Sequence, residues 1–313
     1  MQNLLPTVKI SRIIYIILAF LCLFSFIKPP VALFSGLVFA LIFGSPFPVF
    51  NKKISKYLLQ ASVVGLGFGM NFQESINAGL DGIIFTIFSV VSVMVFGILL
   101  GKWLKVGKVQ SYLIASGTAI CGGSAIAAVG TVAKASDHEM SISLATIFVL
   151  NAIALFIFPV MGHWLNMSQH QFGLWSAIAI HDTSSVVGAA ATYGEEALKV
   201  ATTVKLTRAL WIIPLTVYTA FHFKSKDEKI TIPWFILFFI IAMLVNTYLP
   251  VSKIVMHDIV AVSKQALTLT LFFIGAGLSR NALKTVGARP LITGIILWFF
   301  IAAISLCFIF FFS

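Results

Sequence analysis

Residues 116–130 read SGTAICGGSAIAAVG, a glycine-rich run between two strongly apolar stretches, IIFTIFSVVSVMVFGILL before it and SISLATIFVLNAIALFIFPV after it. Glycine loses more backbone entropy than any other residue when a helix forms, and it offers no side chain to pack. The adjacent Gly122 and Gly123 therefore predict a break in a membrane helix at a binding site. The alternative, close packing of helices through small residues, stays open.

The composition places this run in an integral membrane protein. Of the 313 residues, 59% are hydrophobic and 10% are charged, whereas soluble domains carry charge on about a quarter of their residues. Apolar runs of the about 20 residues that cross a bilayer recur along the chain and leave no room for a soluble domain. We therefore expect a lipid bilayer as partner and no cofactor. Cys22, Cys121 and Cys307 lie inside apolar runs, so they predict neither a disulfide framework nor a metal site.

The net charge of +11 does not predict nucleic-acid binding, because the basic residues are spread through short loops without a dense cluster. Most loop lysines and arginines fall on the side of the N-terminus, around Lys52, Lys102 and Lys224. The positive-inside rule then predicts a cytoplasmic N-terminus and a periplasmic or extracellular C-terminus in a bacterial inner membrane. Local charge patterns also predict helix starts: Ser136 and Glu139 have capping-box spacing, and Glu195 suits the start of a helix.

Hydropathy predicts an all-α membrane protein of eleven transmembrane helices. The predicted spans are 13–28, 30–44, 54–72, 82–101, 109–133, 140–161, 170–191, 196–221, 231–249, 254–279 and 290–312. We expect an extra N-terminal helix in residues 1–29, a first five-helix repeat in 30–161, and a second, inverted repeat in 170–313. Inversion follows because an odd number of helices makes the second set begin on the opposite side of the membrane. Such repeats place discontinuous helices at the membrane midplane, where free helix ends contact substrates and ions.

The second break has competing assignments in the sequence. FIGAGLS, with Gly275 and Gly277, occupies the position in the second half that AICGGSA occupies in the first. However, VGLGFGMN at 64–71 also resembles FIGAGLSR at 273–280, and IHDTSS can be aligned with ICGGSA through Ile180 and Ser184. These pairings cannot all preserve chain order, so the repeat equivalents stay open.

Two groups of polar residues interrupt the apolar seventh and eighth helices. The first is consecutive and comprises His181, Asp182, Thr183, Ser184 and Ser185. An ionisable residue at membrane depth is costly unless it faces a cavity or a partner, so this group predicts a functional site. Asp182 and His181 are the candidates for a coupling proton or sodium ion. A polar cluster that only holds helices together is the structural alternative.

The second group is Lys205 with Arg208, three residues apart and hence on one helix face. At about 1.5 Å per residue, they lie about 12 Å and about 16 Å along the helix from its expected start at Ala197. Two buried cations with only Asp182 as an evident acidic partner predict an anionic substrate, since arginine and lysine bind oxyanions well. A structural salt bridge from Asp182 to either cation is the alternative.

The combination of SGTAICGGSAIAAVG, IHDTSSVVGAA, KLTRALWIIP, FIGAGLS and GARPL resembles the bacterial sulfate exporter family of YeiH-type membrane proteins. The resemblance extends over nearly the whole chain from the second helix onward. It implies the superfamily of sodium/proton antiporters and bile-acid symporters, with two inverted five-helix repeats, crossed broken helices, a panel-and-core arrangement and elevator-type motion. It also allows a homodimer, although no residue here specifies an interface.

The matching segments carry the implied site residues. The resemblance assigns the crossing point to Cys121, Gly122, Gly123 and Ser124 together with Gly275 and Gly277, the substrate or coupling-ion contact to His181, Asp182, Thr183, Ser184 and Ser185, and anion neutralisation to Lys205 and Arg208. The fifth helix has no acidic residue at its break, which argues against coupling through paired carboxylates.

We expect a secondary transporter that exports a small oxyanion, sulfate or a related sulfonate, by alternating access. The alternative is a proton- or sodium-coupled antiporter or symporter of another organic anion, with Asp182 as coupling site. An intramembrane enzyme would rest on Ser184 or Ser185 with Lys205 as a serine–lysine dyad; without HExxH or paired catalytic carboxylates, we expect no enzyme. A passive channel is the remaining option, and the broken helices favour alternating access over it.

Overall fold

The computed structural model describes residues 4–24, 27, 29–73, 83–223, 234–249, 252–277 and 287–312. These residues form α-helices and the turns between them, with no β-strand among them. By length and composition, five helical segments in the described chain are apolar enough to cross a membrane, at 85–103, 138–164, 195–222, 253–277 and 288–311. Shorter apolar helices accompany them at 10–21, 31–43, 123–132 and 235–248. The count of eleven spans stays a prediction.

The helices divide into two compact units, each formed by segments distant in sequence. Unit 1 comprises Met1–Glu74 and Pro233–Asn281, and unit 2 comprises Ser75–Ile232 and Ala282–Ser313. Each unit therefore takes helices from both predicted repeats.

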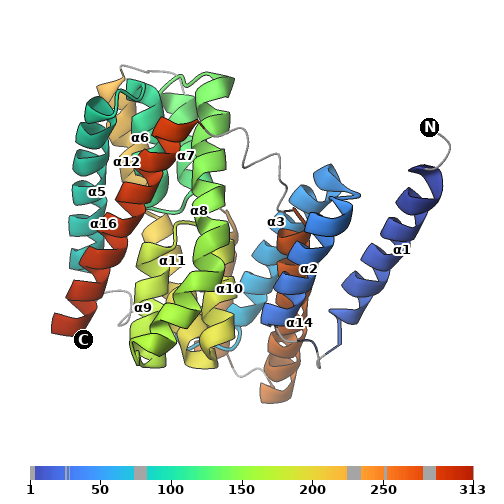
Figure 1. Cartoon of the computed structure of the whole chain (residues 1–313). Helices are drawn as coiled ribbons and strands as arrows, with labels where there is room; N and C mark the ends of the chain where they lie inside the picture. The colour runs from blue at the N-terminus through green and yellow to red at the C-terminus, as the bar shows by residue number, and fades with distance from the viewer. Residues whose placement is uncertain are drawn as a thin grey trace. The chain divides into compact units, whose positions relative to one another are not determined.

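Unit 1 contains α1 (Leu4–Leu21), α2 (Pro29–Phe43), α3 (Pro48–Gly67), α13 (Trp234–Tyr248) and α14 (Lys253–Gly277). Its aromatic core gathers around Tyr15 of α1, whose ring contacts Phe39 and Phe272. The Tyr15 hydroxyl donates a hydrogen bond to the Asn51 side chain, so the only polar atom of this buried ring is paired. This cluster ties α1 to α2, α3 and α14, which are drawn in blue and brown in Figure 1.

Glycines allow α2 and α14 to pack backbone against backbone. A Cβ atom added to Gly36 would lie 2.2 Å from the Phe272 carbonyl oxygen, and one added to Gly275 would lie 2.3 Å from the Leu33 carbonyl oxygen. The helix α14 continues without interruption through Gly275, and Gly277 is its last residue. At Gly275 the structure thus has the close small-residue packing that was the alternative to a helix break.

Unit 2 contains three predicted helices that the structure divides, together with their neighbours. Its helices are α5 (Ile83–Trp103), α6 (Lys108–Ala119), α7 (Gly123–Val132), α8 (Asp137–Trp164), α9 (Gln169–Ala179), α10 (Thr183–Tyr193), α11 (Glu195–Ala209), α12 (Ile212–His222) and α16 (Ala288–Phe312). The predicted capping box before α8 is present, because the Glu139 amide donates to the Ser136 hydroxyl and the Ser136 amide donates to the Glu139 carboxylate. Ser168 and Gln171 form a second capping box at α9 that the sequence analysis missed.

The predicted helix 196–221 is also divided, between α11 and α12 at Leu210 and Trp211. Pro214 lies in the first turn of α12 and has no amide hydrogen to donate to the Leu210 carbonyl. The turn follows directly after Arg208, so it ends the helix that carries both buried cations.

Candidate functional site

The glycine-rich run breaks its helix between Ala119 and Gly123. Here α6 ends, three residues follow in other conformations, and α7 begins. Gly122 has φ +62° and ψ −120°, a combination that residues with a Cβ atom rarely adopt. The Gly122 amide donates to the Gly117 carbonyl at 2.8 Å, which holds the reversed turn in place. The conformation of Gly122 explains why glycine stands at the centre of this apolar segment.

A second break lies in the polar stretch of the seventh predicted helix. The helix α9 ends at Ala179, Ile180 adopts an extended conformation, and Asp182 caps the start of α10. A Cβ atom placed on Gly122 would lie 3.4 Å from the His181 carbonyl oxygen and 3.5 Å from the Asp182 Cα atom. The two breaks therefore touch each other inside unit 2. IHDTSS supplies the partner of the first break, and Gly275 and Gly277 lie in unit 1.

Lys205 connects the C-terminal ends of the two interrupted helices. Its ammonium group donates to the carbonyl oxygens of Ile120, Ala177 and Ile180 at 3.1, 3.2 and 2.7 Å. A lysine ammonium has three donors, so these carbonyls use all of them. The last carbonyls of a helix have no partner inside the helix and carry partial negative charge. Lys205 satisfies such groups at both breaks at once, although it is completely buried.

Arg208, one turn further along α11, holds the end of α6. Its Nε and Nη2 atoms donate to the Ala119 carbonyl oxygen at 2.9 and 2.6 Å. The side chain is 0% exposed, and its Nη1 atom has no hydrogen-bond partner among the described residues. Arg208 thus retains donors that Lys205 lacks, and of the two cations it is the one that can bind an anion directly.

Asp182 interacts with its own helix rather than with a cation. Its carboxylate accepts hydrogen bonds from the Ser184 hydroxyl, from the Ser185 amide at 3.2 Å and from the Ser185 hydroxyl at 3.4 Å. Among the described residues, Asp182 has no ion pair within 4.0 Å with Lys205 or Arg208. The structure therefore does not form the alternative salt bridge from Asp182 to Lys205 or Arg208. It does not form the serine–lysine dyad either, because the serine hydroxyls face Asp182 and the Lys205 donors face carbonyls.

The start of α7 differs from that of α10 because its N-cap residue, Gly122, has no side chain to accept a hydrogen bond from the first amides of the helix. The first amides of α7 have no carbonyl partner inside the helix and form the positive end of its dipole. The Cys121 thiol lies against the Ala125 amide and the Ser124 hydroxyl, and Cys121 itself is buried. Ser124 is exposed and Gly123 is partly exposed, so a solute can reach this helix end. Thr183 and Ser184 are also partly exposed.

Several buried polar atoms of unit 2 have no hydrogen-bond partner in the described structure. They are both ring nitrogens of His181, Nδ2 of Asn151, Nη1 of Arg208, and the hydroxyls of Thr118, Ser143 and Thr202. The His181 amide donates to the Asn151 side-chain oxygen at 3.1 Å, which places these two residues together. His181 and Asn151 are thus two adjacent buried polar residues at the second break.

Asn151 is a site residue that the sequence analysis missed. The signal was visible, since it is an amide in the middle of the apolar run SISLATIFVLNAIALFIFPV. The three carbonyl partners of Lys205 carry no side-chain signal, so no residue pattern could reveal them. Among the residues that the structure describes, no group of three or more His, Cys, Asp or Glu side chains gathers in the geometry of a metal site.

Comparisons with known proteins agree with a membrane location. The family model of conserved hypothetical protein 698 matches residues 29–294. A UPF0324 membrane protein of Bacteroides thetaiotaomicron is 60% identical over 292 residues, covering 92% of this chain and 88% of the relative. One of Porphyromonas gingivalis is 56% identical over 289 residues, covering 91% and 88%, and one of Bdellovibrio bacteriovorus is 46% identical over 304 residues, covering 95% and 94%. No solved structure matches the chain. The chain is therefore a membrane protein that belongs to the family of conserved hypothetical protein 698, as do its relatives named UPF0324 membrane proteins.

Proposed function

We propose that this protein is a secondary transporter that moves a small oxyanion, such as sulfate or a sulfonate, across the inner membrane of a bacterium by alternating access. The observation that carries the proposal is the uncapped start of α7 at the contact of two helix breaks. The proposal keeps the outward direction that the resemblance to sulfate exporters implies.

The available donors favour an anion over a cation. The first amides of α7 point outward from the helix end, and the helix dipole adds partial positive charge there. Arg208, whose Nε and Nη2 atoms bind the Ala119 carbonyl at the end of α6, contributes buried positive charge and an Nη1 atom without a partner among the described residues. Since both groups are donors, a ligand with several acceptor oxygens and negative charge is the best match for them.

The placement of these groups favours transport over a static structural role. Backbone that leaves the helical pattern at membrane depth is tolerated where it is buried in protein or lines a water-filled cavity. Every site contact described above is made inside unit 2, between α6, α7, α8, α9, α10 and α11. An elevator-type motion of unit 2 would therefore carry the site intact.

A second candidate function, cation-coupled transport, is favoured by Asp182. This carboxylate caps α10 beside the start of α7, and the Asp182 Cα atom lies close to Gly122. A negative carboxylate there opposes the entry of an anion, and a proton or sodium ion bound to it removes that repulsion. Binding of a proton or sodium ion at Asp182 would thereby favour binding of the anion, and this would couple the two.

A thermal-shift screen of the purified protein in detergent tests the proposal. The screen compares sulfate, sulfite, thiosulfate, methanesulfonate, acetate and chloride, each as the potassium and as the sodium salt, at constant ionic strength and at several pH values. A ligand that binds only the folded state raises the melting temperature. We expect at least one divalent or sulfonate oxyanion to raise the melting temperature. In Arg208→Lys, the affinity for that anion should fall about tenfold, so a higher concentration is needed for the same stabilisation. Lysine keeps the charge but has a single nitrogen, which cannot hold Ala119 and a substrate with the geometry of the guanidinium fork.

Lys199→Gln is the matched control, because Lys199 lies on the same helix and is exposed. Equal response of the wild type to all six anions would remove the oxyanion proposal. Stabilisation only by sodium or by a change of pH would transfer the primary role to Asp182.

A further inference from the structure

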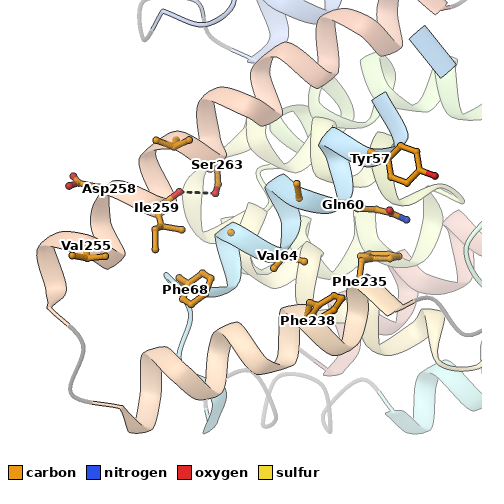
Figure 2. A pocket seen from close by; sticks show the side chains of 13 residues that line it. Tyr57, Gln60, Val64, Phe68, Phe235, Phe238, Val255, Asp258, Ile259 and Ser263 are labelled. Atoms are coloured by element: carbon orange, nitrogen blue, oxygen red, sulfur yellow. Dashed lines mark hydrogen bonds between the residues drawn. The ribbon is translucent and has the colours of Figure 1, made fainter. Parts of the chain in front are cut away.

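A large apolar groove lies in unit 1, whereas the helix breaks belong to unit 2. It measures about 820 Å³ and is bordered by α3, α13 and α14. The helices α13 and α14 both pack on α3, and hardly on each other within the described residues, which leaves the groove open between them. Figure 2 shows α3 lying along the groove between these two helices.

Residues of one face of α3 line the groove over its length. They are Tyr57, Gln60, Ala61, Val64, Gly65 and Phe68, at the spacing of one helix face. Phe235 and Phe238 of α13 and Val262 of α14 complete the apolar walls. The hydroxyl of Ser263 donates to the Ile259 carbonyl at 2.7 Å, so it does not need a partner in the groove (Figure 2). The walls therefore suit a hydrocarbon chain.

The length of the groove fits one leaflet of a bilayer. Eleven residue steps separate Tyr57 from Phe68, and at 1.5 Å per residue this part of α3 is about 16 Å long. The hydrocarbon core of a bilayer is about 30 Å thick, so half of it is about 15 Å. An acyl chain that enters at one end can follow the groove to the membrane midplane.

The charges gather at the Tyr57 end. Lys53 and Lys56 are exposed within one turn of Tyr57. Among the described residues that line the groove, the one acidic residue, Asp258, lies at the opposite end (Figure 2). This polarity matches an anionic headgroup at the Tyr57 end.

We propose that the groove between α3, α13 and α14 is a binding site for an anionic phospholipid. The headgroup contacts Lys53 and Lys56, and one acyl chain lies along the groove against Val64 and Phe238. Selectivity comes from the headgroup, because the surrounding lipid tails are as apolar as the groove. Each basic residue near an anionic lipid contributes about fivefold in affinity, equivalent to about 1 kcal/mol.

Native mass spectrometry of the detergent-solubilised full chain tests this site with two probes of equal chain length, palmitoyl-oleoyl phosphatidylglycerol and palmitoyl-oleoyl phosphatidylcholine. The wild type is expected to bind one phosphatidylglycerol molecule preferentially. The double variant Lys53→Gln/Lys56→Gln should lose about 25-fold in affinity for phosphatidylglycerol and little for phosphatidylcholine. Ala61→Trp, which fills the groove at an exposed alanine, should displace both lipids.

Two controls make the result specific to the groove. Lys102→Gln/Lys105→Gln removes the same charge at exposed positions of unit 2, and Val95→Trp adds the same ring to an exposed position of α5. Both should bind phosphatidylglycerol as the wild type does. The proposal is overturned if the wild type shows no headgroup preference, if Ala61→Trp binds as the wild type does, or if Ala61→Trp instead dissociates a dimer, which would assign the groove to a second copy of the chain. The readout is lipid binding, so it is independent of anion transport.

Discussion

The two helix breaks of unit 2 are alike at one end and different at the other. The C-terminal ends of α6 and α9 are both held by cations of α11, because Lys205 binds carbonyls from each and Arg208 binds Ala119. The N-terminal ends differ, since α10 is capped by the Asp182 carboxylate whereas α7 follows Gly122 and has no side-chain cap. One break therefore carries its own negative charge, and the other leaves donors for an external one.

The two cations of α11 also differ. Lys205 has no donor left, because it donates to three carbonyls of the two breaks. Gly122 offers no side-chain cap to the first amides of α7, although the Ala125 amide lies against the Cys121 thiol, and the Nη1 atom of Arg208 has no partner among the described residues. Two buried cations three residues apart thus have different hydrogen-bond partners, which only the carbonyl positions reveal.

Lys205→Met should produce the largest effect, because it removes the shared support of both breaks. Three buried carbonyls lose their partner at about 1–3 kcal/mol each, partly offset by the relief of a buried charge. We expect a net loss of about 3 kcal/mol or more. At 2–4 °C per kcal/mol, the melting temperature falls by about 6 °C or more.

Thermal unfolding in detergent measures this loss, with Lys199→Met on the exposed face of α11 as the matched control. A Lys205→Met variant as stable as its control would show that the two breaks do not depend on a common cation.

Gly122→Ala should come second, because it affects only the α6–α7 break. Alanine at φ +62° is strained, and its Cβ atom would lie 3.2 Å from Ile147. Strain of this kind costs about 1–3 kcal/mol. Gly107→Ala is the matched control, since a Cβ atom at Gly107 meets nothing within 4 Å. Equal unfolding temperatures of the two variants would mean that Gly122 is not needed for the break.

Replacements of Asp182 should have the smallest effect on stability and sharpen the contrast between the two N-terminal ends. Asparagine caps a helix about as well as aspartate, so Asp182→Asn should leave stability nearly unchanged, whereas Asp182→Ala should cost about 0.5–2 kcal/mol. Because Asp182→Asn removes the charge beside α7, anion binding should become independent of sodium and pH. A dependence as strong as that of the wild type would exclude Asp182 as the coupling site.

The sequence predicts the helices better than it predicts the contacts between them. The break at Gly122 follows from adjacent glycines, and the start of α8 follows from the Ser136 and Glu139 spacing. The sequence offers two candidate partners for this break, IHDTSS and FIGAGLS, because glycine indicates close helix packing as readily as a helix break. At Gly275 the cause is packing on the α2 backbone, which depends on a neighbour distant in sequence. The carbonyl partners of Lys205 are equally invisible to residue patterns.

Exchange of radiolabelled sulfate by proteoliposomes containing the purified protein tests whether an oxyanion binds where the two breaks meet. We expect vesicles loaded with unlabelled sulfate or methanesulfonate to accumulate external labelled sulfate, and Arg208→Lys to reduce the rate about tenfold while the protein stays folded. Folded wild-type protein that exchanges neither anion, at any pH or sodium concentration, would show that the breaks do not form an oxyanion transport site.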